Sequence, residues 1–256
     1  TYYHGQAVAD LTLNDLTNAD NVKSVIWANK PDTSKIGNGN DTATVTFNDG
    51  TTTVINGNYT VTPNDSDKIG TIETQPITVK HGQDPASVDP KDGIKTTLLD
   101  GTKVNWTTKP ALPSGKTYGD TKGTAEVDFP DGSKQSVEIT VHVNSDAEDN
   151  QNKSQHGEGV AFNGTKTYYH GQAVADLTLN DLTNADNVKS VVWANKPDTS
   201  KIGSGADSAT VTFNDGTTTV INGNYTVTPN DSDKIGTIET QPITVKHGQD
   251  PASVDP

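Results

Sequence analysis

Two runs of alternating apolar and polar residues, joined by a tight turn, recur along the chain. In the clearest copy Ala125, Val127 and Phe129 alternate with polar residues, Asp131-Gly132 follows, and the alternation resumes over residues 137–143. A period of two predicts strands with one buried and one wet face, and Asp-Gly favours a hairpin turn. The pattern therefore predicts antiparallel hairpins.

A second hairpin is expected earlier in the chain. Residues 43–47 alternate in the same way, Asn48-Asp49-Gly50 turns the chain, and residues 53–61 form the returning strand, with a bulge predicted at Gly57. Short strands at 77–80 and 167–169 each end at a His-Gly-Gln tripeptide. Between that tripeptide and the next strand, residues 11–16 and 92–98 are each expected to form a turn of helix.

The chain repeats itself. Residues 1–90 return as residues 167–256 at an offset of 166, with four differences: Ile26/Val192, Asn38/Ser204, Asn40/Ala206 and Thr42/Ser208. His-Gly-Gln also occurs inside the period, so two unlike units alternate. We expect units at 1–70, 71–159 (with a linker at 144–159) and 160–236, and the start of a fourth at 237–256.

Each complete unit carries the same landmarks in the same order. A glycine of the tripeptide, a strand-borne tryptophan and a phenylalanine before the turn are predicted to be structural core or turn residues: Gly5, Gly82, Gly171, Trp27, Trp106, Trp193, Phe47, Phe129 and Phe213. Few short strands, Gly and Pro turns and one Trp per unit are typical of small immunoglobulin-like sandwiches. The expected fold is therefore all-β, with tandem sandwich domains in an elongated head-to-tail array.

Composition excludes several classes of function. The chain has no Cys and no Arg, and its formal net charge is −14. Disulfides and thiolate chemistry are impossible, and a nucleic-acid partner is not expected because phosphate backbones are repelled. No apolar run is long enough to span a membrane. Because it lacks an initiator Met, the sequence is expected to be an excerpt from a longer chain.

The second unit resembles a known family. The run Leu-Asp-Gly-Thr-Lys-Val-Asn-Trp-Thr-Thr-Lys-Pro at 99–110 and the hairpin sequence at 123–143 are similar to Rib domains, the Rib/alpha-like tandem repeats of Gram-positive surface proteins. The other units keep the skeleton at 27–35 and 47–51, but lack the Pro before Asp-Gly and carry an Asn-Gly-Asn insertion at 56–58. The resemblance implies an immunoglobulin-derived β fold, stacking into a stalk and attachment of the full protein to the cell wall.

The His-Gly-Gln histidines are candidates for ligands or general bases. His4, His81 and His170 have no nucleophile or shared orienting acid at fixed spacing. A structural role is favoured, with the glycine supplying a special backbone angle and the flanking side chains capping the strand end.

The tryptophans suggest two interpretations. They could stack on sugar rings of a host glycan, helped by Tyr3, Tyr59 or Tyr118, or they could be the main core residues of small units. The core interpretation is favoured.

Two acidic segments invite comparison with calcium loops. Residues 65–70 place Ile69 at a ligand position, and residues 146–151 lack the required Gly and Glu. Both are predicted to be solvated linker, the second within a linker at 144–163. No metal or cofactor is predicted.

Intramolecular isopeptide or ester crosslinks need a buried Lys or Thr beside its partner and an acid. Lys35, Lys103 and Lys201 are predicted in turns or strand edges. A crosslink is therefore not expected, although sequence leaves the question open.

These observations predict a protein that is not an enzyme. We expect structural stalk repeats, extracellular on the cell wall or surface of a Gram-positive bacterium, that project a distal adhesive domain and contact mainly their neighbouring repeats. The alternative is that the repeats themselves adhere, through host glycan or through homophilic association in biofilm as pH falls toward the isoelectric point of 4.6.

Overall fold

The computed structural model describes residues 1–250 and 252. They divide into two compact units, residues 1–144 (unit 1) and residues from 145 onward (unit 2). The described residues form three four-stranded sheets and one two-stranded sheet. The predicted all-β fold of tandem small domains is confirmed.

Unit 1 holds two of the four-stranded sheets, in the orders β1-β4-β3-β2 and β5-β8-β7-β6. In each sheet the strand that comes first in the chain runs parallel to the strand that comes last, and the other neighbours are antiparallel. The strands are β1 (Tyr2–Tyr3), β2 (Val22–Asn29), β3 (Gly37–Phe47), β4 (Thr52–Thr62), β5 (Ile77–Val79), β6 (Lys103–Thr108), β7 (Gly119–Asp128) and β8 (Lys134–Val143). We name the residues from β1 to the end of α1 module 1, and those from β5 to β8 module 2.

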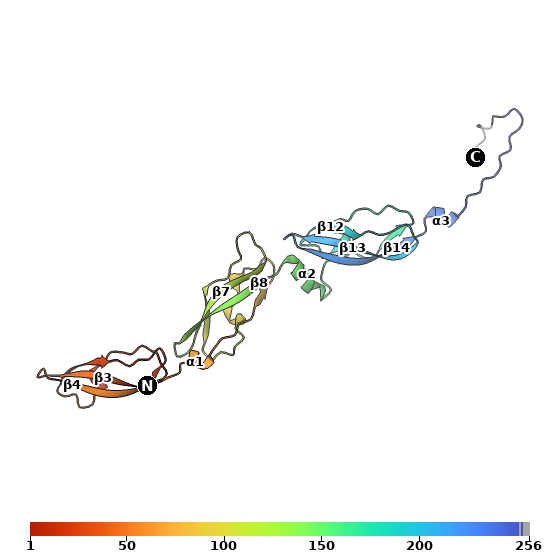
Figure 1. Cartoon of the computed structure of the whole chain (residues 1–256). Coiled ribbons are helices and arrows are strands. Elements are labelled where there is room, and N and C mark those ends of the chain that lie inside the picture. The colour runs from red at the N-terminus through yellow and green to blue at the C-terminus, as the bar shows by residue number, and fades with distance from the viewer. Residues whose placement is uncertain (251, 253–256) are drawn as a thin grey trace. The chain divides into compact units, whose positions relative to one another are not determined.

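Unit 2 repeats the topology in the sheet β10-β14-β13-β12 and adds the two-stranded sheet of β9 and β11. Its strands are β9 (Ala161–Phe162), β10 (Lys166–Tyr169), β11 (Leu182–Thr183), β12 (Val188–Asn195), β13 (Gly203–Phe213) and β14 (Thr218–Thr228). We name the residues from β10 to the end of α3 module 3, and residues 145–165 before it the leading segment. Each module is built around one long hairpin: β3–β4 in module 1, β7–β8 in module 2 and β13–β14 in module 3 (Figure 1).

Coil and short helices make up most of the remaining described residues. The helices are η1 (Leu13–Asp15), α1 (Asp65–Ile69), η2 (Pro85–Ser87), η3 (Pro90–Gly93), α2 (Asp146–Ser154), η4 (Leu179–Asp181) and α3 (Asp231–Ile235). The expected turn of helix at 11–16 is η1. The expected turn at 92–98 is found only at its start, as the end of η3, because Pro90 starts that helix two residues earlier than predicted.

The predicted alternation places the core. Ala125 and Val127 of β7 and Ile139 and Val141 of β8 have no exposed surface, and Phe129 before the turn is 4% exposed. The strands pair antiparallel from Gly119–Val143 to Asp128–Lys134 around the Asp131-Gly132 turn. The hairpin prediction is confirmed.

The bulge predicted at Gly57 is wrong. The β3–β4 register runs without a shift through the pair Asp41–Gly57. A Cβ at Gly57 would clash with Oδ1 of Asp41. This glycine therefore makes room for a side chain across the strand.

The solvated linkers predicted at 65–70 and 146–151 are also wrong, because both segments begin helices. In α1 and α2 the capping residue accepts a backbone hydrogen bond from the third helical residue, whose own side chain caps in return. The pairs are Asn64 with Asp67 and Ser145 with Glu148. Such capping boxes satisfy N–H groups that a helix start leaves unpaired, so even polar sequences become helical there.

The predicted fourth unit begins as a turn without a sheet. In residues 237–250 Gly248 has φ +85° and Gln249 N donates to Lys246 O, but no strand forms there. The remainder of this predicted unit, apart from Ala252, lies outside the described residues.

Candidate inter-module interface

The His-Gly-Gln tripeptides form tight turns at the ends of the entering strands. Gly5, Gly82 and Gly171 have φ of +75°, +77° and +73°, which favour glycine. In module 1, Gln6 Oε1 accepts a hydrogen bond from Tyr3 N at 2.8 Å, and module 3 repeats this contact at the same distance. The glycine and the glutamine thus hold the histidine in a fixed place.

His4 joins three parts of module 1. Its Nδ1 lies 2.9 Å from Asp67 Oδ2 in α1, and its Nε2 lies 3.1 Å from Ser34 O in the loop before β3. Both ring nitrogens face oxygen atoms that only accept, so the imidazolium form makes both hydrogen bonds. The pKa of His4 is accordingly above its ordinary value, first because of the hydrogen bond to Asp67.

Module 3 makes the same arrangement. His170 contacts Asp233 in α3 through Nδ1 at 2.9 Å and Ser200 O through Nε2 at 3.1 Å. The hydrogen bond to Asp233 is again the first cause of a raised pKa of His170. Since Asp67 and Asp233 also cap their helices, each histidine fixes a short helix to the end of its own module.

The helix α1 in turn docks on the hairpin turn of module 2. Asp131 Oδ2 accepts from Asp65 N, and Ser133 Oγ accepts from Ser66 N at 3.0 Å. Gln135 Nε2 donates to Ser66 O at 3.0 Å and to Gly70 O at 2.8 Å. The Asp-Gly-Ser turn therefore binds the first turn of the preceding helix.

An apolar contact accompanies these hydrogen bonds. Ile69, the last residue of α1, packs against the cluster of Ile72, Val127 and Phe129. Burial raises the pKa of Asp131, but the hydrogen bonds from Ser133 and Asp65 outweigh it, so the pKa lies below its ordinary value. The carboxylate at the centre of this junction is thus held in its charged, accepting form.

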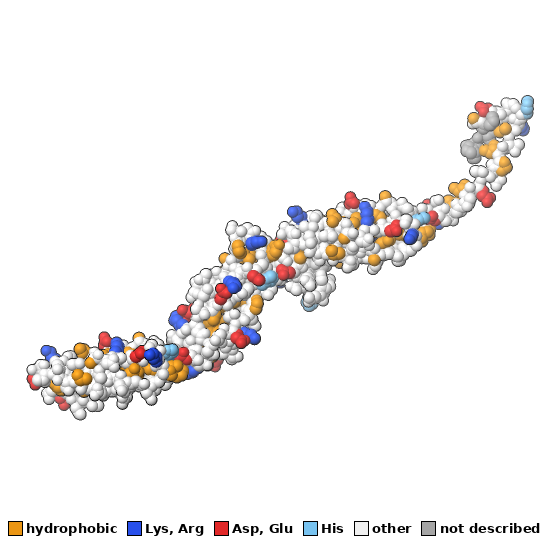
Figure 2. Space-filling view, in the orientation of Figure 1, with side chains coloured by type: hydrophobic (Ala, Val, Ile, Leu, Met, Phe, Trp, Pro, Cys, Tyr) orange, Lys and Arg blue, Asp and Glu red, His pale blue; other side chains and the backbone are white. Residues whose placement is uncertain are grey.

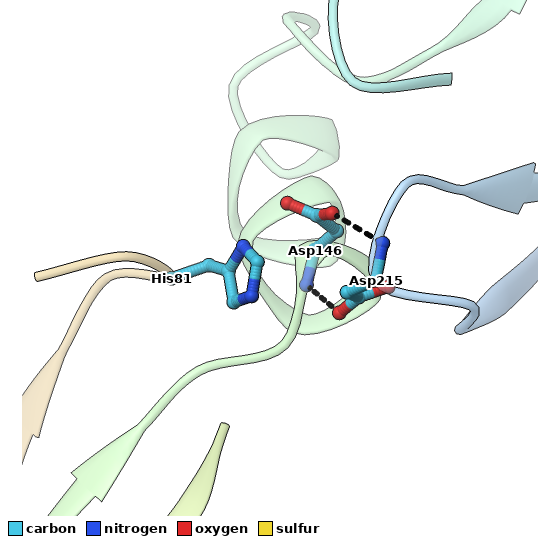
Figure 3. Close-up of side chains that lie close together, drawn as sticks. All are labelled: His81, Asp146 and Asp215. Carbon is cyan, nitrogen blue, oxygen red and sulfur yellow. Dashed lines mark hydrogen bonds between the residues drawn. The ribbon is translucent and has the colours of Figure 1, made fainter. Parts of the chain in front are cut away.

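Unit 2 contains the same contact between α2 and the hairpin turn of module 3. Asp215 Oδ2 accepts from Asp146 N at 2.8 Å, and Asp146 Oδ2 accepts from Asp215 N at 3.3 Å (Figure 3). Thr217 Oγ1 accepts from Ala147 N at 3.2 Å. In each unit an Asp-Gly-Ser/Thr turn therefore binds the first residues of a short helix.

The landmark aromatics lie in and beside the cores. Each indole Nε1 donates to a backbone carbonyl at 2.9 Å, from Trp27 to Ala9, from Trp106 to Val88 and from Trp193 to Ala175. All three rings are half-buried, and the most buried side chains are aliphatic. Phe129 and Phe213 are 4% and 3% exposed, whereas Phe47 is half-buried.

A groove of about 270 Å³ lies beside Trp193 in module 3. Its lining includes Lys166, Tyr168 and Asp181, and Lys166 Nζ forms an ion pair with Asp181. Lys35, Lys103 and Lys201, the candidate crosslink lysines, are exposed.

Several residues of the junction escaped the sequence analysis. Asn64-x-x-Asp67 and Ser145-x-x-Glu148 are capping boxes in the sequence, and they are the signal for α1 and α2. Asp131 is predicted only as a turn residue, and Asp215 holds the same place before a glycine in module 3. Nothing in the sequence alone indicates that their second carboxylate oxygen accepts from another element.

Charge is spread rather than concentrated on the face that Figure 2 shows. Lys and acidic side chains are interspersed over the face in Figure 2. Among the described residues, no helix is long and apolar enough to cross a membrane.

Replacing His4 and His170 together by asparagine is expected to remove a pH-dependent part of the stability. Because both pKa values are raised above 6.5 in the folded state, the stabilisation is complete below about pH 6.5 and is lost as pH rises through the folded-state pKa. Calorimetric melting temperatures of the wild type should therefore fall as pH rises from 6.5, and those of the double variant should fall less.

The matched control is His156→Asn, which changes an exposed histidine after α2. It should keep the wild-type pH dependence. Equal slopes in the wild type and the double variant would show that the two histidines do not stabilise their helices.

Parts of the chain are similar to known proteins. Residues 65–145 match the Rib domain family. The chain is 32% identical over 238 residues to the C protein alpha-antigen of Streptococcus agalactiae, covering 90% of this chain and 22% of that protein. It therefore spans about a fifth of the length of this curated relative. A solved Rib structure from Streptococcus pyogenes is 32% identical, with 32% of this chain and all of that chain covered, at a TM-score of 0.27. The predicted resemblance is thus confirmed: residues 65–145 match the Rib domain family, and the chain is similar over most of its length to the C protein alpha-antigen.

Proposed function

We propose that the chain is a run of stalk repeats in a longer protein on the cell wall of a Gram-positive bacterium, where it holds a distal adhesive domain away from the surface. The observation that carries the proposal is the junction itself. The turn of module 2 binds α1 in unit 1, and the turn of module 3 binds α2 in unit 2, through the same donors and acceptors. Modules joined by such contacts resist bending better than modules joined by free linkers.

The similarity to a streptococcal antigen supports the stalk role. The chain is related to a streptococcal antigen more than four times its length, as the covered share of 22% indicates. A repeat whose recurring contacts join consecutive parts of the chain is suited to act as a spacer. The number of repeats then sets how far the distal domain projects.

Small-angle scattering of the full chain tests the proposal. Three modules in series, with strands of up to 11 residues, should extend over about 100 Å and give a radius of gyration of about 30 Å. A single compact domain of this length would give about 18 Å. The extended value is expected, and a value near the compact one would contradict the stalk.

Two controls separate docking from other causes. High salt screens the net charge of −14, so an extension that depends on docking should persist while one that depends on repulsion should shrink. Adhesion by the repeats themselves predicts Trp quenching by glycans, or growing scattering mass as pH falls toward 4.6. A pure stalk should show neither.

A further inference from the structure

Modules 1 and 3 have nearly the same sequence but differ in burial. Ile221 is 7% exposed in module 3, whereas its counterpart Ile55 is 39% exposed in module 1. The same difference separates three further pairs, each buried in module 3 and half-buried in module 1: Leu182 and Leu16, Val188 and Val22, Phe213 and Phe47. One face of module 1 is therefore open where module 3 is closed.

The four substitutions do not explain this difference. Ile26 and Val192 are both exposed, at 63% and 59%. The other three changes lie near the start of β3 and β13, and none of them replaces a residue of the face that differs. The cause is a covering segment, not a change in the face.

In module 3 that cover is the leading segment, residues 145–165. Val160 is 5% exposed and belongs to the same cluster as Leu182 and Ile221, and Ala147 and Phe162 pack against it. Strands β9 and β11 also pair antiparallel, so Phe162 lies opposite Leu182 and Ala161 lies opposite Thr183.

The phenylalanine of the segment lies over the sheet itself. A Cβ at Gly223 of β14 would lie 2.5 Å from the ring of Phe162, and the ring stacks on Trp193 at 5.8 Å between centroids. The three atoms nearest to a Cβ at the counterpart Gly57 all belong to Asp41. No aromatic ring is among these neighbours in module 1.

Polar groups fix both ends of the leading segment. Its start is held by the hydrogen bonds of Asp146 and Ala147 to the Asp215 turn, and Asn184 Nδ2 donates to Gly159 O at 3.0 Å. At its far end the next residue, Lys166, pairs with Asp181.

Module 1 presents the same groups ready formed. Asp49 Oδ1 accepts from Thr51 N at 2.9 Å and from Thr51 Oγ1 at 2.7 Å, as Asp215 does from Thr217 at 2.8 and 2.6 Å. Asp15 is the counterpart of Asp181, and the same Thr hydrogen bonds orient it. By the offset of 166, the counterpart positions of residues 145–165 would lie before Thr1.

We propose that the open face of module 1 is a docking groove for a second copy of the leading segment, carried by a neighbouring repeat of the array. The groove consists of Leu16, Val22, Phe47 and Ile55, with Asp49 at one end and Asp15 at the other. The occupant is a peptide of the type Ser-Asp-Ala-Glu followed by Gly-Val-Ala-Phe and Lys. The inference does not depend on the stalk role, because it compares two copies of one fold.

The test is binding of a synthetic peptide of residues 145–166 to the full chain, followed by fluorescence anisotropy of a label on the peptide. One saturable site per chain is expected, since module 3 already holds its own segment. Phe162→Ala in the peptide should weaken binding at least tenfold, because the ring that fills the space over β4 is lost. Absence of saturable binding, or equal binding of a scrambled peptide, would overturn the proposal.

Matched variants of the chain locate the site. Ile55→Lys changes the groove, and Val54→Lys changes the neighbouring residue on the opposite face of β4. Both positions are exposed, at 39% and 59%, so both variants should fold. Binding should weaken at least tenfold in the first and stay unchanged in the second; equal effects would place the peptide elsewhere and refute the groove.

A fusion tests whether the segment acts from a neighbouring repeat. Placing residues 145–166 directly before Thr1 should fill the groove, protect the amide of Ile55 from hydrogen exchange and abolish binding of the free peptide. Unchanged exchange and unchanged peptide binding would contradict the proposal. An extended scattering profile with no peptide binding would refute this inference and leave the stalk intact.

Discussion

Ile139→Ala is expected to destabilise module 2 by about 2–5 kcal/mol, the usual cost of removing a large aliphatic side chain from a closed core. Ile139 has no exposed surface and lies at the centre of β8, paired with Gly123. Its methyl groups fill the space above Gly93, where a Cβ would clash with Ile139 Cγ2. The backbone on both sides is therefore fixed, and the cavity left by truncation cannot collapse easily.

The effect is large relative to the module. A domain of about 75 residues has a stability of roughly 4–11 kcal/mol, so the variant loses a large share of it. Hydrogen exchange of β7 and β8 amides measures the change within module 2 alone. Val54→Ala, at a position 59% exposed in β4 of module 1, is the control; read from β3 and β4 amides, it should cost less than about 0.5 kcal/mol. A similar small cost at Ile139 would mean that the hairpin face is not the core of the module.

The hairpins could be predicted because each physical signal is local. Alternation from Ala125 to Phe129 fixes which face is buried, and Asp131-Gly132 fixes the turn, with Gly132 at φ +85°. The repeat then carries the prediction to the other modules. No long-range information is needed for this part of the fold.

The junction could be predicted only in part. The composition of residues 144–163 indicated a linker, but Ser145 and Glu148 form a capping box that starts α2. Composition averages over a segment, whereas a helix start depends on two side chains at a spacing of three. The docking of that helix on Asp215 joins residues 69 positions apart, which no local pattern shows.

Gly57 illustrates the same limit. Glycine within a strand indicates either a bulge or a close approach of other atoms, and the sequence does not distinguish them. The β3–β4 register places Asp41 opposite Gly57, and this shows that the glycine allows the close approach of the Asp41 side chain.

Burial in modules 1 and 3, which have nearly identical sequences, depends on what covers them. The cost of truncating the same isoleucine should therefore differ between the two modules. Ile221→Ala is expected to cost module 3 about 2–4 kcal/mol, because the side chain is 7% exposed within the cluster that Val160 and Phe162 complete. Ile55→Ala, the same change in module 1, should cost less than about 1 kcal/mol, since Ile55 is already 39% exposed. Hydrogen exchange resolved by module measures both in separate single variants.

The pair is informative because neighbouring sequence, strand register and residue type are the same. Ala43 and Ala209 lie opposite these two isoleucines in the same register. A difference in cost therefore measures the cover supplied by residues 145–165. Equal costs would show that the leading segment adds nothing to the stability of module 3. Fusing residues 145–166 before Thr1 should raise the cost of Ile55→Ala toward that of Ile221→Ala, because the Ile55 side chain then leaves water on folding.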